Sequence, residues 1–347
     1  MISLADTRLS RTISPTNGSI FPTLSLDRAE VRWEHYLDDL TPVQTGDSGI
    51  GWKREDTFAP LGYGGINGSK LRQLIYLVRG YVADGGRGGV LTAASVLSPQ
   101  VSMAALVAKH YRLPVTIMLG ATNSASARRH ENVAIAEDAG ASFRYTPVAY
   151  NPALQRAVSQ LARTSAYSGH YRLAYGISTP TGATVEELAA FHAVGAHQTV
   201  NLPDATRTLA MTLGSGNSAT SVLLGLAHRR PPALERLVLF GVGPSRLDWT
   251  LDRLDRIRAL LGLRDPLAGL RLEHHDLHHQ RFASYADRMP YTLDGIALHP
   301  TYEGKAVTFM AQHQTMFRWF WRPQPGESVF WIVGSAPSRQ MMAGQLR

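Results

Sequence analysis

The amino-acid sequence predicts an α/β protein made of two three-layer α/β/α domains with mostly parallel, twisted sheets. The 347-residue chain is 44% hydrophobic and 18% charged, which supplies enough apolar sequence for a large buried core. Short apolar runs alternate with helix-length segments, as expected for parallel strands that are covered by helices. This alternation stops and later starts again, which indicates two separate α/β layers.

The first alternating region begins with a predicted helix over residues 68–86 that ends in glycines. It continues with predicted strands at 88–95, 114–120 and 142–148 and predicted helices at 99–113 and 124–140. Strands of this length between helices of ten to fifteen residues are typical of βαβ units. Upstream, residues 1–50 are predicted to be an irregular lead-in with a short helix at 26–40.

The second alternating region lies in the C-terminal half of the chain. Its predicted strands are 206–216, 233–243 and 327–335, and its predicted helices are 217–230 and 246–262. The sequence contains no internal repeat and no low-complexity linker. The second region therefore predicts its own parallel sheet.

Composition excludes several kinds of site. The chain has no cysteine, so disulfides, thiolate zinc sites, iron–sulfur clusters and cysteine nucleophiles are excluded. Residues 1–21 lack the apolar core of a signal peptide, and no stretch reaches membrane-spanning length. We therefore expect a cytoplasmic protein without membrane contact.

The chain is basic, with a formal net charge of +8 and a pI near 9.8. A basic surface attracts polyanions, so DNA or another polyanion is a candidate partner. The arginines are scattered, however, and no run of five or six basic residues occurs. Charge alone therefore favours an ordinary solvated surface over a nucleic-acid site.

Two glycine-rich turns are followed by predicted helices. In the segment 64–74, small residues precede Lys70, one of only four lysines beside 31 arginines. In the segment 214–218, Gly-Ser-Gly-Asn-Ser connects a predicted strand to a predicted helix. Backbone N–H groups and the helix N-terminus would form a phosphate cradle there, although a tight strand-to-helix turn also requires glycine.

These stretches resemble one family, the pyridoxal-phosphate (PLP) enzymes of fold type II, or tryptophan-synthase-β-like group. Residues 52–77 are similar to the branch of 1-aminocyclopropane-1-carboxylate deaminase and D-cysteine desulfhydrase, in which Lys-Arg-Glu-Asp is followed by Gly-Gly-Asn-Lys-x-Arg-Lys-Leu-Glu. Here Lys53-Arg54-Glu55-Asp56 is intact, and Lys70, Arg72 and Leu74 match the start of the helix. The loop 214–218 resembles that family's phosphate loop. Residues 301–306 resemble Asp-Pro-Val-Tyr-Glu-Gly-Lys, and 328–337 resemble its closing strand and turn.

The resemblance implies a role for each candidate residue. A lysine amine forms a Schiff base with an aldehyde and arginine does not, so Lys70 would form the aldimine with PLP. Glu303 would keep the pyridine nitrogen protonated, which favours carbanion chemistry. Ser98 and Tyr302 would face the substrate, with Tyr285 or Tyr291 as a second tyrosine. The remaining expected cofactor-binding residues are Gly214, Ser215, Gly216, Asn217, Ser218 and Gly334.

The sequence departs from the family pattern where relatives bind substrate. The family's Ser-Asn-Gln becomes Ser98-Pro99-Gln100, or, shifted by one, Ser98 takes the asparagine position behind Leu97. In both registers the asparagine is absent, and proline supplies neither an N–H nor a polar side chain. The lead-in to Lys70 is two residues longer than in the family, and Val333-Gly334-Ser335 replaces a more glycine-rich turn.

We therefore expect a PLP-dependent lyase or deaminase acting on a small amino acid. The resemblance implies a discontinuous cofactor domain (1–78 and 191–347), an inserted small domain (79–190) and a homodimer. One alternative is decarboxylation or deamination of an amino-acid moiety on a modified nucleotide in DNA. The other is a catalytically silent homologue used as a binding protein.

Two further clusters are assigned structural roles. The histidines between 274 and 279 would have metal-ligand spacing on a helix, but no third-ligand motif accompanies them, so we expect a polar surface and no metal. The aromatic stretch 316–331 contains arginines that would suit base stacking. A core edge or subunit interface is the favoured interpretation.

Overall fold

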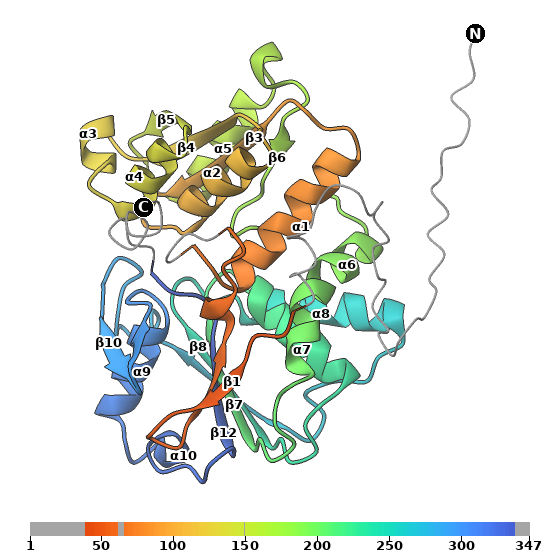
Figure 1. Cartoon of the computed structure of the whole chain (residues 1–347), viewed down its shortest axis with the longest axis vertical. Coiled ribbons are helices and arrows are strands. Elements are labelled where there is room, and N and C mark those ends of the chain that lie inside the picture. The colour runs from red at the N-terminus through yellow and green to blue at the C-terminus, as the bar shows by residue number, and fades with distance from the viewer. Residues whose placement is uncertain (1–38, 62–65, 149, 337–347) are drawn as a thin grey trace.

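The computed structural model describes residues 39–61, 66–148 and 150–336 and contains two β-sheets surrounded by helices (Figure 1). The larger sheet has the strand order β1-β2-β12-β7-β8-β9 and the smaller has the order β5-β4-β3-β6. Within these two sheets, every neighbouring pair is parallel except β1 with β2. The predicted α/β class is confirmed, whereas the helix predicted at 26–40 lies outside the described residues except for its last two positions, which are not helical.

The larger sheet combines segments from both ends of the described chain. Its strands are β1 (Val43–Thr45), β2 (Gly51–Arg54), β7 (Thr208–Leu213), β8 (Arg236–Gly241), β9 (Arg271–Asp276) and β12 (Ser328–Ile332). Strand β12 lies between β2 and β7, with Phe330 opposite both Trp52 and Ala210. A late strand thus brings residues after 332 beside the segment that leads to Lys70.

Side chains alternate across the strands of this sheet and fill a core on each face. On one face, Leu209 and Met211 pack with α6 (Val185–Ala196), α7 (Asn217–His228) and α8 (Leu247–Leu261).

On the other face, Ala210 packs with α9 (Glu303–Gln312) and the region of α10 (Arg318–Trp321). Phe317 and Phe320 are fully buried there. The aromatic stretch near the C-terminus is therefore largely core.

The smaller sheet lies between residues 90 and 172. Its strands are β3 (Val90–Ser95), β4 (Val115–Gly120), β5 (Ser142–Thr146) and β6 (Tyr171–Arg172), and its helices are α2 (Gln100–His110), α3 (Ser124–Ala127), α4 (Glu131–Asp138) and α5 (Asn151–Leu161). The helix predicted over 124–140 is interrupted because His130 adopts an extended conformation and begins α4. All of these strands lie inside the predicted insert, and on this basis we propose the domain division at 79–190.

Helix α1 (Ser69–Ala83) connects the two sheets (Figure 1). The remaining elements are the hairpin β10 (Tyr291–Leu293) and β11 (Ile296–Leu298) and the 3-10 turns η2 (Glu55–Thr57), η3 (Ser165–Tyr167) and η4 (His197–Thr199). His274 and His275 lie on strand β9, so the helical spacing considered for them does not occur. In the described part of the chain, no cluster of three potential metal ligands is found. None of the described helices has the length and apolar character needed to cross a membrane.

Candidate active site

A cleft lies where the larger sheet meets the first turn of α2. Five segments line it: part of 67–70, Pro99 just before α2 with Met103 in it, most of 212–219, part of 299–302, and 333–335. Its empty volume, including space open to solvent, is about 520 Å³. Parallel strands β7 and β12 both end at this cleft, which is the usual ligand-binding edge of such sheets.

Lys70 is held in the cleft by the way α1 begins. Gly68 precedes the helix with φ 93° and ψ −174°, a backbone conformation that is essentially restricted to glycine. The N–H of Gly68 donates to the Phe58 carbonyl at 3.0 Å, and that of Ser69 donates to the Val333 carbonyl at 2.9 Å. Lys70 therefore leaves the helix at a point anchored to the end of β12.

A reciprocal amide contact joins the two segments that differ from the family pattern. Asn67 Nδ2 donates to Ser335 Oγ at 2.7 Å, and the Ser335 N–H donates to Asn67 Oδ1 at 2.9 Å. The altered lead-in to Lys70 and the altered closing turn thus provide each other's hydrogen-bond partners. Residues 62–65 of the lead-in lie outside the described part of the chain.

The Lys70 amine has the surroundings of a nucleophile. Among the described residues no hydrogen bond holds Nζ, which lies 5.3 Å from the centroid of the Tyr302 ring. Burial lowers the pKa of Lys70 to about 8, while the nearby Glu303 carboxylate acts in the opposite direction. A much larger fraction of the amine is neutral at physiological pH than in an ordinary lysine.

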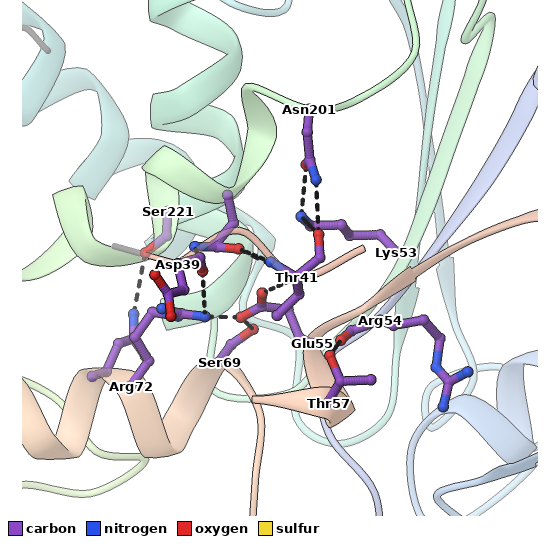
Figure 2. Close-up of polar contacts among 12 residues, drawn as sticks. Asp39, Thr41, Lys53, Arg54, Glu55, Thr57, Ser69, Arg72, Asn201 and Ser221 are labelled. Atoms are coloured by element: carbon purple, nitrogen blue, oxygen red, sulfur yellow. Dashed lines mark hydrogen bonds and ion pairs between the residues drawn. The ribbon is translucent and has the colours of Figure 1, made fainter. Parts of the chain in front are cut away.

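A buried polar network lies beneath the start of α1 (Figure 2). Glu55 accepts hydrogen bonds from Thr41 Oγ1 at 2.7 Å and Ser69 Oγ at 3.1 Å, and its Oε2 lies 3.6 Å from Arg72 Nε. The Lys-Arg-Glu-Asp motif therefore positions the helix that carries Lys70.

Lys53, the first residue of that motif, also has a structural contact. Its Nζ donates to the Thr41 carbonyl and to Asn201 Oδ1, both at 2.7 Å. Burial lowers the pKa of Lys53 to about 7. Two of the chain's four lysines thus have lowered pKa values near this helix, but only Lys70 lines the cleft.

The glycine loop connects β7 to α7 as the sequence predicts. Gly216 has φ 92°, and a Cβ at this position would lie 2.6 Å from Thr250 Oγ1 and 2.7 Å from the Trp249 ring. Gly214, Ser215, Gly216 and Ser218 line the cleft at the N-terminus of the twelve-residue α7. This arrangement suits an anion such as a phosphate.

Asn217, the remaining residue of the loop, does not line the cleft. Its Nδ2 donates to the carbonyls of Gly176 and Ile177, both at 3.1 Å, and its Oδ1 accepts from Arg253 Nη1 at 3.1 Å. The side chain thus anchors the loop to the 176–177 segment. We propose that Asn217 positions the loop and that its neighbours bind the phosphate.

The Tyr-Glu-Gly-Lys segment places three of its side chains in different environments. The Tyr302 hydroxyl forms a 2.9 Å hydrogen bond with that of Tyr285. Glu303 is fully buried; its Oε1 accepts from the Val333 N–H at 2.9 Å, whereas Oε2 has no partner among the described residues. Burial raises the pKa of Glu303 to about 8. Lys305 Nζ donates to the Ser284 carbonyl at 2.6 Å and so fixes the loop that carries Tyr285.

The structure does not bring Ser98 into the lining of the cleft; Pro99 takes that place. Ser98 Oγ accepts from the Gln100 N–H at 3.3 Å. The Gln100 amide donates to Thr92 Oγ1 at 2.6 Å and accepts from the Gly176 N–H at 2.8 Å. In the family pattern this segment binds substrate. Here the Gln100 side chain instead links strand β3 to the 176–177 segment.

Several lining residues were not identified from the sequence: His299, Thr212, Asn67 and Met103. His299 had a signal, because it takes the position of aspartate in the family's Asp-Pro-Val-Tyr-Glu-Gly-Lys. Thr212 is an ordinary strand residue in the sequence. Its buried hydroxyl has no hydrogen-bond partner among the described residues, which only the fold reveals.

The residues present suit PLP. Lys70 offers an amine, the glycine loop offers N–H groups at a helix N-terminus, and Glu303 offers a buried carboxylate oxygen that lacks a partner. A protonated pyridine nitrogen is the kind of donor that such an oxygen requires. We propose these three attachment points for the cofactor.

The chain was compared with known proteins. No family model matches the chain. A relative described as an O-seryl-dTMP PLP-dependent decarboxylase, from Salmonella phage ViI, is 33% identical over 92% of this chain and 87% of the relative.

Solved structures of low sequence identity share the fold. An ACC deaminase homologue matches with TM-score 0.62 and 18% identity, covering 89% of this chain and 93% of its own. Diaminopropionate ammonia lyase of Escherichia coli matches with TM-score 0.56 and 13% identity, covering 90% and 91%. With the cleft geometry and the phage relative, these matches confirm the predicted family: the chain belongs to the pyridoxal-phosphate-dependent enzymes of fold type II.

Proposed function

We propose that this enzyme decarboxylates an amino-acid group carried on a pyrimidine deoxynucleotide, either free or within DNA. The expected lyase-type chemistry on an amino acid is kept, and the bond broken and the carrier are specified. The observation that carries the proposal concerns the segment where the family binds a small substrate. Here the Gln100 side chain is bonded to Thr92 and Gly176 and does not line the cleft, and Pro99 replaces the family's asparagine. The name of the phage relative supports the same reaction.

When bound, PLP withdraws electrons from a bond at the substrate Cα, so that carbon dioxide can leave. Lys70 would hold the cofactor and later, with its lowered pKa, move a proton at Nζ. Glu303 Oε2 would accept a hydrogen bond from the pyridine nitrogen. The N–H groups at Gly214, Ser215 and Gly216 would bind the phosphate.

Other residues of the cleft would orient the substrate and exclude water. Pro99 and Met103 present apolar surface from the small domain, facing the Lys70 side. The hydrogen bond between Tyr285 and Tyr302 fixes both rings, and Tyr302 stands beside the Lys70 amine. A fixed geometry of this kind restricts which bond at Cα is aligned for cleavage.

Positive charge near the cleft favours an anionic carrier. Arg288 is exposed, yet it lies near both His299 in the cleft and His130 of the small domain. Burial is the main cause of the lowered pKa of each histidine, and the charge of Arg288 lowers both further. It stands between the two regions, where a nucleotide phosphate would gain from it. The overall charge of +8 acts in the same direction.

The test uses purified protein loaded with PLP and O-seryl-dTMP, free and within an oligonucleotide. Release of one carbon dioxide per substrate, with the amine retained on the nucleotide, supports the proposal. Release of ammonia instead, or activity only on free amino acids, contradicts it. Lys70→Ala is the matched inactive control, and loss of oligonucleotide binding with rising salt would show a DNA partner.

The same preparation addresses the remaining alternatives. A visible cofactor band that is absent in Lys70→Ala excludes a catalytically silent homologue. The homodimer expected from the family stays a prediction, and light scattering on the PLP-loaded protein checks it.

A further inference from the structure

His299 occupies a fixed position on the wall of the cleft. It follows β11 and precedes α9, and its carbonyl accepts from the N–H groups of Tyr302 at 3.1 Å and Gly304 at 2.9 Å. Its ring lies edge-on to the Tyr302 ring, with the centroids 4.7 Å apart. The residue is only 6% exposed and lines the same cleft as Lys70.

The hydrogen bonds determine which ring nitrogen carries the proton. The Thr301 N–H donates to His299 Nδ1 at 3.1 Å, so Nδ1 is the acceptor and the proton resides on Nε2. Burial, followed by the charges of Lys70, Arg288 and Lys305, lowers the pKa of His299 to about 3. The imidazole is therefore neutral, and among the described residues no hydrogen bond is made to Nε2.

Several other polar groups in and beside the cleft are already engaged. Gln100 is bound to the smaller sheet, and Ser98 lies outside the lining. Ser215 Oγ donates to the Gly176 carbonyl at 3.3 Å, and Tyr302 is bonded to Tyr285. A substrate carboxylate that enters this cleft finds Nε2 of His299 as a free donor.

We propose that the Nε2–H of His299 donates the hydrogen bond that holds the carboxylate of the amino-acid substrate, in place of the family's Ser-Asn-Gln segment. The proposal rests on the decarboxylation proposed above and identifies the residue that selects for the group to be removed.

A neutral donor suits a decarboxylase better than a cation does. The carboxylate loses its negative charge as carbon dioxide forms, so a lysine or arginine partner would stabilise the starting state more than the transition state. A neutral imidazole also binds the carboxylate, but it stabilises the charged starting state less and so raises the barrier to decarboxylation less.

The test separates carboxylate recognition from cofactor chemistry with two small probes on PLP-loaded protein. The first, 3-methoxypropionate, carries the carboxylate but no amine and cannot react. The second, 2-methoxyethylamine, carries the amine but no carboxylate. Titration calorimetry with the first and the visible cofactor band with the second give the two affinities in wild type, His299→Phe and His299→Gln.

We expect His299→Phe to bind 3-methoxypropionate about tenfold or more weakly, as for one lost hydrogen bond to a charged group. It should bind 2-methoxyethylamine as wild type does. His299→Gln should recover part of the lost affinity, because its amide N–H lies near the Nε2 position.

Equal weakening of both probes in His299→Phe would show a merely structural role and overturn the inference, as would unchanged binding of the carboxylate. Both variants must retain the wild-type cofactor band, which confirms that they fold. Because neither probe is decarboxylated, the result stands apart from the proposed function: ammonia release from O-seryl-dTMP by the wild type would refute decarboxylation without changing this measurement.

Discussion

Gly68→Ala should displace the start of α1, and with it Lys70, from the end of β12. A Cβ at position 68 would meet the Val333 carbonyl oxygen and would lie 2.8 Å from Gly334 Cα. Both are backbone atoms, so no side-chain rotation relieves the contact. Gly68 also has φ 93° with ψ −174°, a conformation that alanine rarely adopts.

The expected cost has two parts. Holding a non-glycine residue in this region of backbone space costs about 1–3 kcal/mol, and shifting the packed neighbours costs about 1–3 kcal/mol more. The variant should therefore lose roughly 2–6 kcal/mol of unfolding free energy, a large share of the 5–15 kcal/mol typical of a folded domain. Because Ser69 is bonded to Val333 at 2.9 Å, Lys70 moves with the helix start and PLP affinity falls too.

Urea unfolding of the apoenzyme measures the first effect, and titration of the visible cofactor band measures the second. Gly80→Ala is the matched control, because Gly80 lies in the same helix with no atom within 4 Å of its Cβ position. This control should be stabilised by about 0.5–1 kcal/mol. Wild-type stability and cofactor affinity in Gly68→Ala would refute the reasoning.

Three further predictions concern the charged groups around the cleft. The apoenzyme should capture PLP faster as the pH rises to about 8, the lowered pKa of Lys70, because the neutral amine is the nucleophile; a rate that keeps rising to pH 10.5 would contradict this. The pKa of Glu303 is raised to about 8, so folding takes up a proton between pH 4.5 and 8. The free energy of unfolding of the apoenzyme therefore decreases as the pH rises through that range. Glu303→Gln should remove this pH dependence, which amounts to a total change of up to about 5 kcal/mol. An unchanged pH dependence in urea unfolding would contradict the prediction. Glu55→Gln should lose about 3–5 kcal/mol because it leaves Arg72 without its buried carboxylate, whereas Glu235→Gln, an exposed pair with Arg207, should lose less than about 1 kcal/mol.

Local sequence patterns predicted six of the twelve described strands and most of the described helices. Apolar runs such as 208–213 and 236–241 are buried on both faces, and a run of that kind is recognisable without any partner. Polar strands were not recognised: β9 carries two histidines and three charged residues. It is an edge strand, and its exposed or half-buried positions tolerate them. The 124–140 helix was predicted as continuous, whereas the extended backbone of His130 separates α3 from α4.

The sequence by itself determined the family, the α/β class and the candidates Lys70, Glu303 and the glycine loop, because each depends on residue type and near neighbours. Only the tertiary structure decided which residues share the cleft. Ser98 is outside it and Gln100 is turned away, while His299 and Thr212 are inside. The cleft brings together segments more than a hundred residues apart, such as those of Asn67 and Ser335, and no local pattern encodes such contacts.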